Sequence, residues 1–214
     1  MIVDVFHDTV CPWCRIGKKY LDEALAQWEG PEVTVRWHPF VLQPHIPPAG
    51  VEFRQHMARI KGDSNIQPLL DHVMQAGKTC GLAFDFDRVE KMPNTLDSHR
   101  LVALAPEEKQ SDVLDAIHRA YFEDGRDIGN LATLTAIAVE AGLDANEIES
   151  QLAGDAARHE VEAEATWARE QGISGVPLFI FDGKAIVSGA QPAEMLLKAL
   201  QQFATMPVSS TSSF

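Results

Sequence analysis

The spacing of apolar positions at the start of the chain changes from that of a strand to that of a helix and back. Residues 1–7 are mostly apolar and β-branched, which is typical of a short buried strand. Apolar side chains at helical spacing follow over residues 12–28, and Gly30-Pro31 ends that helix. Apolar and polar residues then alternate over residues 33–38, which predicts a second strand. This order predicts a βαβ unit with two parallel strands.

The middle of the chain carries only helical spacings. Prolines make residues 38–50 an irregular connection, and from there to Gly172 glycines separate apolar stripes of helical period. One stripe consists of Phe53, Met57 and Ile60, and another of Ile66, Leu69, Leu70, Val73 and Cys80. We therefore expect helices throughout this region.

Strand patterns return near the C-terminus. Residues 178–181 and 185–188 flank Asp182-Gly183, a pair typical of a tight hairpin, and an amphipathic helix follows over residues 192–203. The element order predicts an α/β fold in which both ends of the chain share one sheet. We expect residues 1–48 and 166–205 to form this sheet domain and residues 49–165 to form an all-helical insertion. Residues 206–214 have nothing to bury and are expected to be a disordered tail.

The charge of the chain narrows its expected partners. Among 214 residues, 31 acidic and 18 basic side chains give a net charge of −13. Such a chain repels phosphate backbones and anionic lipids, so we expect neither nucleic acid nor a membrane as a partner. There is no apolar run of spanning length, and the N-terminus lacks the basic and apolar segments of a secretion signal. We therefore expect a cytoplasmic protein.

Two of the three cysteines lie in the segment Cys11-Pro12-Trp13-Cys14, at the predicted start of the first helix. Side chains three residues apart on a helix share a face. Free backbone N–H groups and the helix dipole stabilise a thiolate at the first position, and Pro12 suits a first turn because its missing N–H would have had no partner. This arrangement predicts a redox dithiol with Cys11 as the nucleophile and Cys14 as the resolving thiol.

Other roles for the cysteines remain open at this point. A zinc site needs four ligands, and only Cys80 and histidines without finger spacing are available, so we expect no metal. A purely structural disulfide between Cys11 and Cys14 is a second alternative. Cys80 lies on an apolar stripe and is predicted to be a buried small hydrophobic residue rather than a third redox centre.

Five segments, in order through nearly the whole chain, carry a joint resemblance to a known family. They are Asp8 to Gly17, Trp37 to Leu42, Pro93 to Leu101, Gly172 to Pro177 and Ser188 to Pro192. Together they resemble the FrnE-like branch of the DsbA-type thiol–disulfide oxidoreductases. The resemblance implies a thioredoxin-like βαβ…ββα sheet with a large helical insertion. It also implies that Val176-Pro177 is a cis-proline loop against the dithiol, with the backbone of Val176 offered to the substrate chain.

The resemblance suggests further site residues. The Asn94-Thr95 pair is expected to open a helix that roofs the active site, with His99 one turn later, although His99 is equally consistent with simple packing. Trp13, Phe40 and Leu42 are candidates for an apolar lip for the substrate, beside Pro12, although such side chains are more often simply part of a core. Many superfamily members keep a buried carboxylate on the first strand, where this chain has Val5.

An acidic residue, Asp8, lies closer to the dithiol in the sequence than Val5 does. Asp8 or His7 is a candidate for proton transfer from Cys14, and Asp8 is equally consistent with a cap at the helix entry.

The favoured function is exchange of protein or peptide disulfides and dithiols through Cys11 and Cys14. The Cys11–Cys14 disulfide then replaces any bound cofactor, and glutathione is a possible co-substrate. One alternative is a glutathione-dependent isomerase or transferase of the 2-hydroxychromene-2-carboxylate isomerase type. Related isomerases and kappa-class glutathione transferases carry serine at the position of Cys11 and lack the second cysteine. A second alternative to the favoured function is a non-enzymatic holdase that binds unfolded peptides. Either direction of exchange, and any oligomeric state, is compatible with the sequence.

Overall fold

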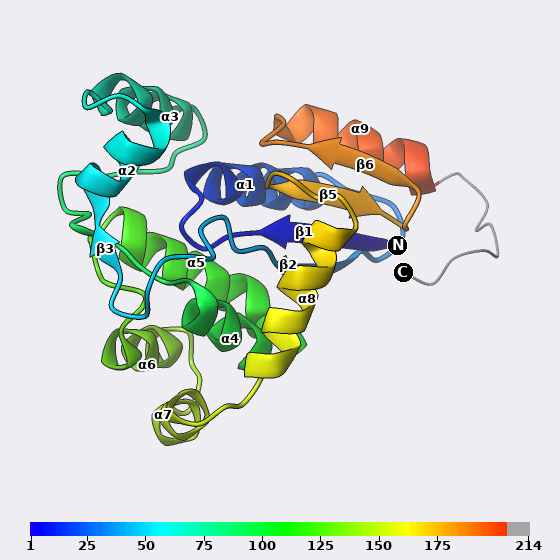
Figure 1. Ribbon diagram of the computed structural model, residues 1–214. Coiled ribbons are helices and arrows are strands. Elements are labelled where there is room, and N and C mark those ends of the chain that lie inside the picture. The colour runs from blue at the N-terminus through cyan, green and yellow to red at the C-terminus, as the bar shows by residue number, and fades with distance from the viewer. Residues whose placement is uncertain (205–214) are drawn as a thin grey trace.

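The two ends of the chain form one four-stranded sheet with the strand order β2-β1-β5-β6 (Figure 1). β1 (Ile2–His7) pairs in parallel with β2 (Thr34–Pro39), as predicted from the βαβ pattern. β5 (Leu178–Phe181) runs antiparallel to β1, and β6 (Ala185–Ser188) is antiparallel to β5. The structure is a computed structural model and describes residues 1–204, so the expected disordered tail, 206–214, lies outside the described residues.

The hairpin between β5 and β6 is built as its sequence predicts. Asp182 and Gly183 form its turn with φ angles of 48° and 65°. The connection spans residues 182–184, and Lys184 N donates to the Phe181 carbonyl at 2.9 Å. Aspartate and glycine tolerate left-handed backbone in such a turn better than most residues.

Helices cover both faces of the sheet. α1 (Pro12–Ala26) and α9 (Ala193–Ala204) pack together against one face, which carries Val3 and Val5 of β1. On the other face Phe6 packs against Ala168 of α8 (Arg158–Glu170). The alternation along β1 therefore supplies apolar side chains to two layers, which is the reason for its nearly continuous apolar sequence.

The region between the sheet halves is helical, with one addition. It contains α2 (Phe53–Lys61), α3 (Gln67–Thr79), α4 (Leu96–Leu104), α5 (Gln110–Phe122), α6 (Leu131–Glu140), α7 (Ala145–Ala153) and a short 3₁₀ turn at Glu107–Lys109. The prediction of helices alone was wrong in one place, because β3 (Val51–Glu52) pairs antiparallel with β4 (Lys91–Met92). Two-residue strands are too short to show an alternating pattern.

Among the described residues no helix is long and apolar enough to cross a membrane.

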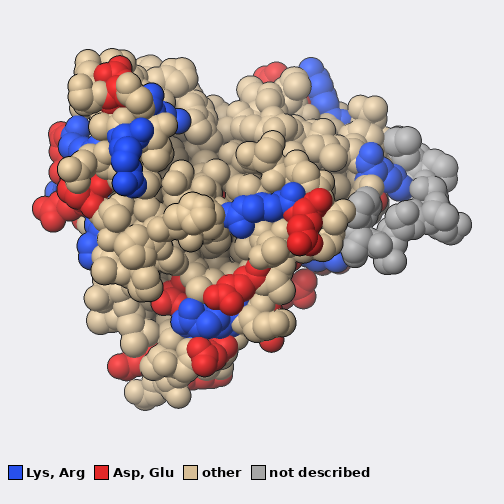
Figure 2. Space-filling view, in the orientation of Figure 1, with Lys and Arg blue, Asp and Glu red and all other residues tan. Residues whose placement is uncertain are grey.

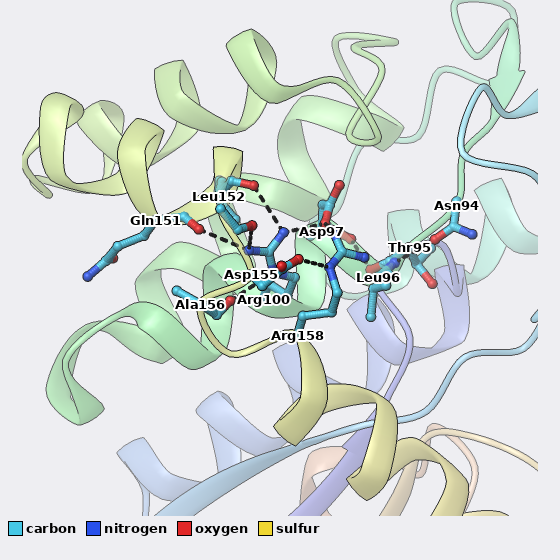
Figure 3. A network of polar contacts seen from close by, with 12 residues as sticks. Asn94, Thr95, Leu96, Asp97, Arg100, Gln151, Leu152, Asp155, Ala156 and Arg158 are labelled. Atoms are coloured by element: carbon cyan, nitrogen blue, oxygen red, sulfur yellow. Dashed lines mark hydrogen bonds and ion pairs between the residues drawn. The ribbon is translucent and has the colours of Figure 1, made fainter.

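A buried arginine connects α4 to the end of α7 (Figure 3). The Arg100 side chain is fully buried and donates to the carbonyls of Gln151, Leu152, Gly154 and Ala156 at 2.6–3.1 Å. It also donates to Asp97 Oδ1 at 2.8 Å. The last carbonyls of a helix lack partners within that helix, so Arg100 satisfies the C-terminus of α7 and fixes its turn toward α8.

Candidate active site

The first turn of α1 carries both cysteines of the dithiol. Cys11 is the N-cap residue with extended backbone, and Pro12 occupies the first turn. The backbone N–H groups of Cys14 and Arg15 both point to the Cys11 carbonyl, at 3.0 and 3.3 Å. Cys11 and Cys14 are free thiols. The structure therefore places Cys11 at the N-terminus of α1, where the first backbone N–H groups have no partner within the helix, and Cys14 one turn further in.

A proline loop lies against the outer cysteine. The Val176-Pro177 peptide bond is cis, as the resemblance implies. The Val176 carbonyl oxygen lies 3.7 Å from Cys11 Sγ, and the loop continues directly into β5. The half-buried Val176 therefore has its main chain next to the sulfur, although its use by a substrate stays a prediction.

Cys14 is the more deeply enclosed thiol, with 2% of its surface exposed. The backbone N–H of Asp8 donates to Cys14 Sγ at 3.5 Å. Burial raises the pKa of Cys14 well above its usual value, and the neighbouring Cys11 and the charge of Asp8 act in the same direction. Cys14 is therefore protonated at neutral pH, and its sulfur becomes nucleophilic only after that proton has left.

An apolar cavity of about 230 Å³ opens directly beside Cys11. It lies between the start of α1 and the helices α2 and α3 of the insertion. Its walls include Trp13, Leu42, Met57, Ile60, Leu69 and Leu70. In the view of Figure 2 the notch between the α2–α3 lobe and the sheet is formed mostly by uncharged residues, and charged side chains gather around its edges. This surface suits an apolar group next to the Cys11 sulfur.

The apolar stripe of α2 belongs partly to the core and partly to the cavity wall. Phe53 is 4% exposed and belongs to the core, as its stripe predicts, but Ile60 is 41% exposed. Met57 and Ile60 continue the stripe of Phe53 into the cavity wall. An apolar stripe predicts which side of a helix avoids water, and it does not distinguish a core from a cavity. Cys80, by contrast, is buried at 7% exposure, as predicted.

Two of the expected binding residues, Phe40 and Asn94, lie outside the described lining of the cavity. Phe40 is buried among Phe6, Ala168 and Leu178, below the guanidinium of Arg169. It is not among the described residues that line the cavity, so the apolar lip contains Trp13 and Leu42 without it.

Asn94 is also absent from the described lining of the cavity. Its side chain donates to the Ile46 carbonyl at 2.7 Å and accepts from Leu96 N at 3.0 Å. Asn94 therefore fastens the proline-rich connection to the start of α4, while Thr95 occupies the N-cap position.

The two candidates for proton transfer, His7 and Asp8, lie near His99 and near a further histidine that the sequence did not suggest. His7, Asp8 and His99 are each buried at 2% exposure or less, and so is His118 of α5. His99 Nε2 lies 3.5 Å from Asp8 Oδ1. His118 had no signal beyond a histidine within an apolar helical pattern, which is also typical of simple packing.

The chain matches the family described as the DSBA-like thioredoxin domain over residues 2–201. A crystal structure of a probable DsbA oxidoreductase from Streptomyces coelicolor is 33% identical, with a TM-score of 0.89 and coverage of 100% of this chain and 94% of that one. A 2-hydroxychromene-2-carboxylate isomerase is 18% identical, with a TM-score of 0.73 and coverage of 94% and 95%. The cytosolic disulfide reductase DsbM from Pseudomonas aeruginosa, in a structure with GSH, is 19% identical, with a TM-score of 0.68 and coverage of 94% and 98%.

These findings agree with the geometry of the site. The two likenesses of low identity show a shared fold only, whereas the family match spans both halves of the sheet and the whole insertion. The fold is therefore thioredoxin-like, with a helical insertion between its βαβ and ββα parts. The protein belongs to the DSBA-like thioredoxin domain family.

Proposed function

We propose that the protein is a thiol–disulfide oxidoreductase that exchanges disulfides through Cys11 and Cys14. The observation that carries this proposal is the pair of free cysteines one helical turn apart, with Cys11 Sγ beside the cis-proline loop at 3.7 Å from the Val176 carbonyl. Two thiols in this arrangement allow attack and resolution within one site.

In the reductive direction Cys11 attacks one sulfur of a substrate disulfide and forms a mixed disulfide. Cys14 then loses its proton and attacks Cys11 Sγ, so that the second substrate thiol leaves and the Cys11–Cys14 disulfide forms. Two electrons pass from the enzyme dithiol to the substrate. The same steps in reverse oxidise a substrate dithiol.

The proposed substrates are protein or peptide disulfides that carry an apolar side chain near the cysteine. A cavity of about 230 Å³ is smaller than the roughly 300–1,000 Å³ typical of pockets for whole small-molecule ligands, so it fits one side chain. The Val176 backbone next to Cys11 supports strand-like pairing with an extended peptide. Glutathione as a co-substrate and a cytoplasmic location are further parts of the proposal, supported by the description of DsbM as a cytosolic disulfide reductase with GSH.

Single cysteine variants test this function. Cys11→Ser is expected to abolish reduction of insulin disulfides. Cys14→Ser is expected to accumulate mixed disulfides with substrate or glutathione, measured by intact-protein mass spectrometry. Near wild-type turnover by Cys14→Ser would contradict the two-thiol mechanism. A glutathione-dependent isomerase would tolerate that change and would convert a hydroxychromene substrate.

A further inference from the structure

The sheet face that packs against α8 is only partly covered. Residues opposite each other on neighbouring strands point to the same side of a sheet, so Phe6 shares a row with His38 and Leu178. α8 packs on this row (Figure 1). The next row on the same face contains one residue from each strand, and these are Arg36, Asp4, Ile180 and Ile186. Ile186 is 66% exposed, so this second row ends in an uncovered apolar side chain.

A groove of about 530 Å³ lies between α8 and the second row. The residues that line it from the helix are spaced by three or four positions, which places them on one side of α8, and they are Glu160, Ala163, Glu164 and Trp167. The Trp167 ring lies 6.3 Å from the Phe6 ring and is still 36% exposed. A large exposed aromatic side chain beside a groove is typical of an interaction surface.

Most charges in the groove neutralise one another. The Asp4 carboxylate contacts Arg36 Nε at 2.6 Å and His38 Nε2 at 2.7 Å. Glu164 contacts the other nitrogen of the same imidazole. Glu160 differs, because it has no ion-pair partner among the described residues. The groove therefore keeps one carboxylate that is free to meet a cation.

The opposite side of the Trp167 ring is acidic as well. A second hollow, of about 410 Å³, lies there and is bordered by Glu162 and Glu170. Neither carboxylate has an ion-pair partner in the part of the chain that the structure describes. Together with Glu160, three uncompensated carboxylates thus surround an exposed indole ring.

The charge of this surface limits what can bind there. Nucleic acid and anionic lipids are repelled by it. A second copy in a twofold dimer would place the same carboxylates against each other. Residues 205–214 of this chain contain no basic side chain that could neutralise them. A basic segment of another protein complements both the charge and the apolar floor of the groove.

We propose that the groove beside Trp167 binds a basic segment of a partner protein, in which arginine or lysine alternates with apolar residues. Alternate side chains of an extended segment point in opposite directions. The cationic ones then face Glu160 and the Trp167 ring, where a guanidinium gains cation–π attraction, and the apolar ones face Ile180 and Ile186. α1 lies on the other face of the sheet, so the bound segment does not need the dithiol.

A fluorescein-labelled, cysteine-free peptide that alternates arginine and leucine tests this proposal by fluorescence anisotropy. We expect saturable binding that weakens as salt is added, because salt screens the carboxylates. The matched peptide with glutamate in place of arginine should not bind. Trp167→Ala and Glu160→Lys should each weaken binding of the arginine peptide about tenfold.

Glu149→Lys is the matched control, because it makes the same charge change at an exposed position of α7 outside the groove. It should keep the wild-type affinity. Equal weakening by Glu149→Lys and Glu160→Lys would show that only net charge attracts the peptide, and would overturn the site. Absence of saturable binding to the wild-type protein up to millimolar peptide would overturn it too.

Sedimentation of the wild-type protein tests the competing occupant. A dimer that Glu160→Lys dissociates would assign the groove to a second copy and overturn the proposal, whereas we expect Glu160→Lys to leave the oligomeric state unchanged. Because the peptide carries no cysteine, none of these outcomes depends on the proposed dithiol function.

Discussion

Gly17 of α1 and Pro177 of the cis-proline loop lie in direct contact. A Cβ atom at Gly17 would come within 2.8 Å of Pro177 Cγ and 3.2 Å of Phe179 Cζ. Gly17 is two turns into the helix that Cys11 begins, and Pro177 follows the residue whose carbonyl faces Cys11 Sγ. The absence of a side chain at Gly17 therefore allows the helix and the loop to approach closely enough to form the site.

Gly17→Ala is expected to push α1 away from the loop. Overpacking of this kind costs about 1–3 kcal/mol, and the displaced loop should lower kcat/KM for peptide disulfides. Urea unfolding and insulin reduction measure the two effects. Gly175→Ala is the matched control, because a Cβ atom at Gly175 would meet no atom within 4 Å. Equal stability of the two variants would show that α1 tolerates the extra methyl group.

Substrate preference should depend on the apolar cavity. Met57→Asp places a charge in its wall and is expected to lower kcat/KM about tenfold for a peptide disulfide with leucine beside the cysteine. A matched peptide with aspartate at that position should be a poor substrate of the wild-type protein. Met195→Asp, on α9 and 52% exposed, is the control. Equal rates for both peptides would remove the assigned role of the cavity and leave the dithiol chemistry intact.

His38 makes the contact between the sheet and α8 dependent on pH. Its Nε2 lies 2.7 Å from Asp4 Oδ1, and its Nδ1 contacts Glu164 of α8. Burial by itself would lower the pKa of His38, but the two carboxylates outweigh burial and raise it to about 9. The folded-state pKa thus exceeds the unfolded value of 6.5.

The stability that His38 contributes should therefore be fully present below pH 6.5 and should be lost as the pH rises through 9. The shift corresponds to about 3 kcal/mol in the free energy of unfolding. Urea unfolding at a series of pH values checks this, and His38→Gln should remove most of the loss. His159→Gln, an exposed change on the same helix, should keep the wild-type pH dependence. A wild-type stability that does not change across this range would show that His38 is not charged in the folded protein.

Removal of the Arg100 side chain should destabilise the insertion. Arg100→Met removes the buried donor of four carbonyls and leaves Asp97 with only the longer contact to Arg158, at 3.4 Å (Figure 3). We expect a loss of about 3–5 kcal/mol in the free energy of unfolding. Arg158→Gln, at the partly exposed edge of the same network, should cost less than about 1 kcal/mol. Similar losses in the two variants would argue against the difference in burial as the cause.

Local sequence patterns were sufficient for most elements and for the dithiol. The alternating and helical spacings predicted β1, β2, β5, β6 and the helices around them, because each pattern reports on one element and on which of its sides avoids water. Cys11 and Cys14 were predictable for the same reason, since their spacing and position at a helix start are local properties. The cis-proline loop followed only from the resemblance, because no local pattern distinguishes it from other X–Pro bonds.

The sequence by itself thus determined the order along the chain of the strands of the main sheet and the place of Cys11 at the start of α1. Tertiary structure decided which residues surround it. Phe40 became core instead of lip because it packs against Ala168 of α8, and Ile60 became part of the wall of the cavity beside Cys11. The contact of Asp8 with His99 joins residues 91 positions apart. Such a contact depends on how α4 and α5 pack beneath the loop after β1, and periodicity along a single element carries no information about that packing.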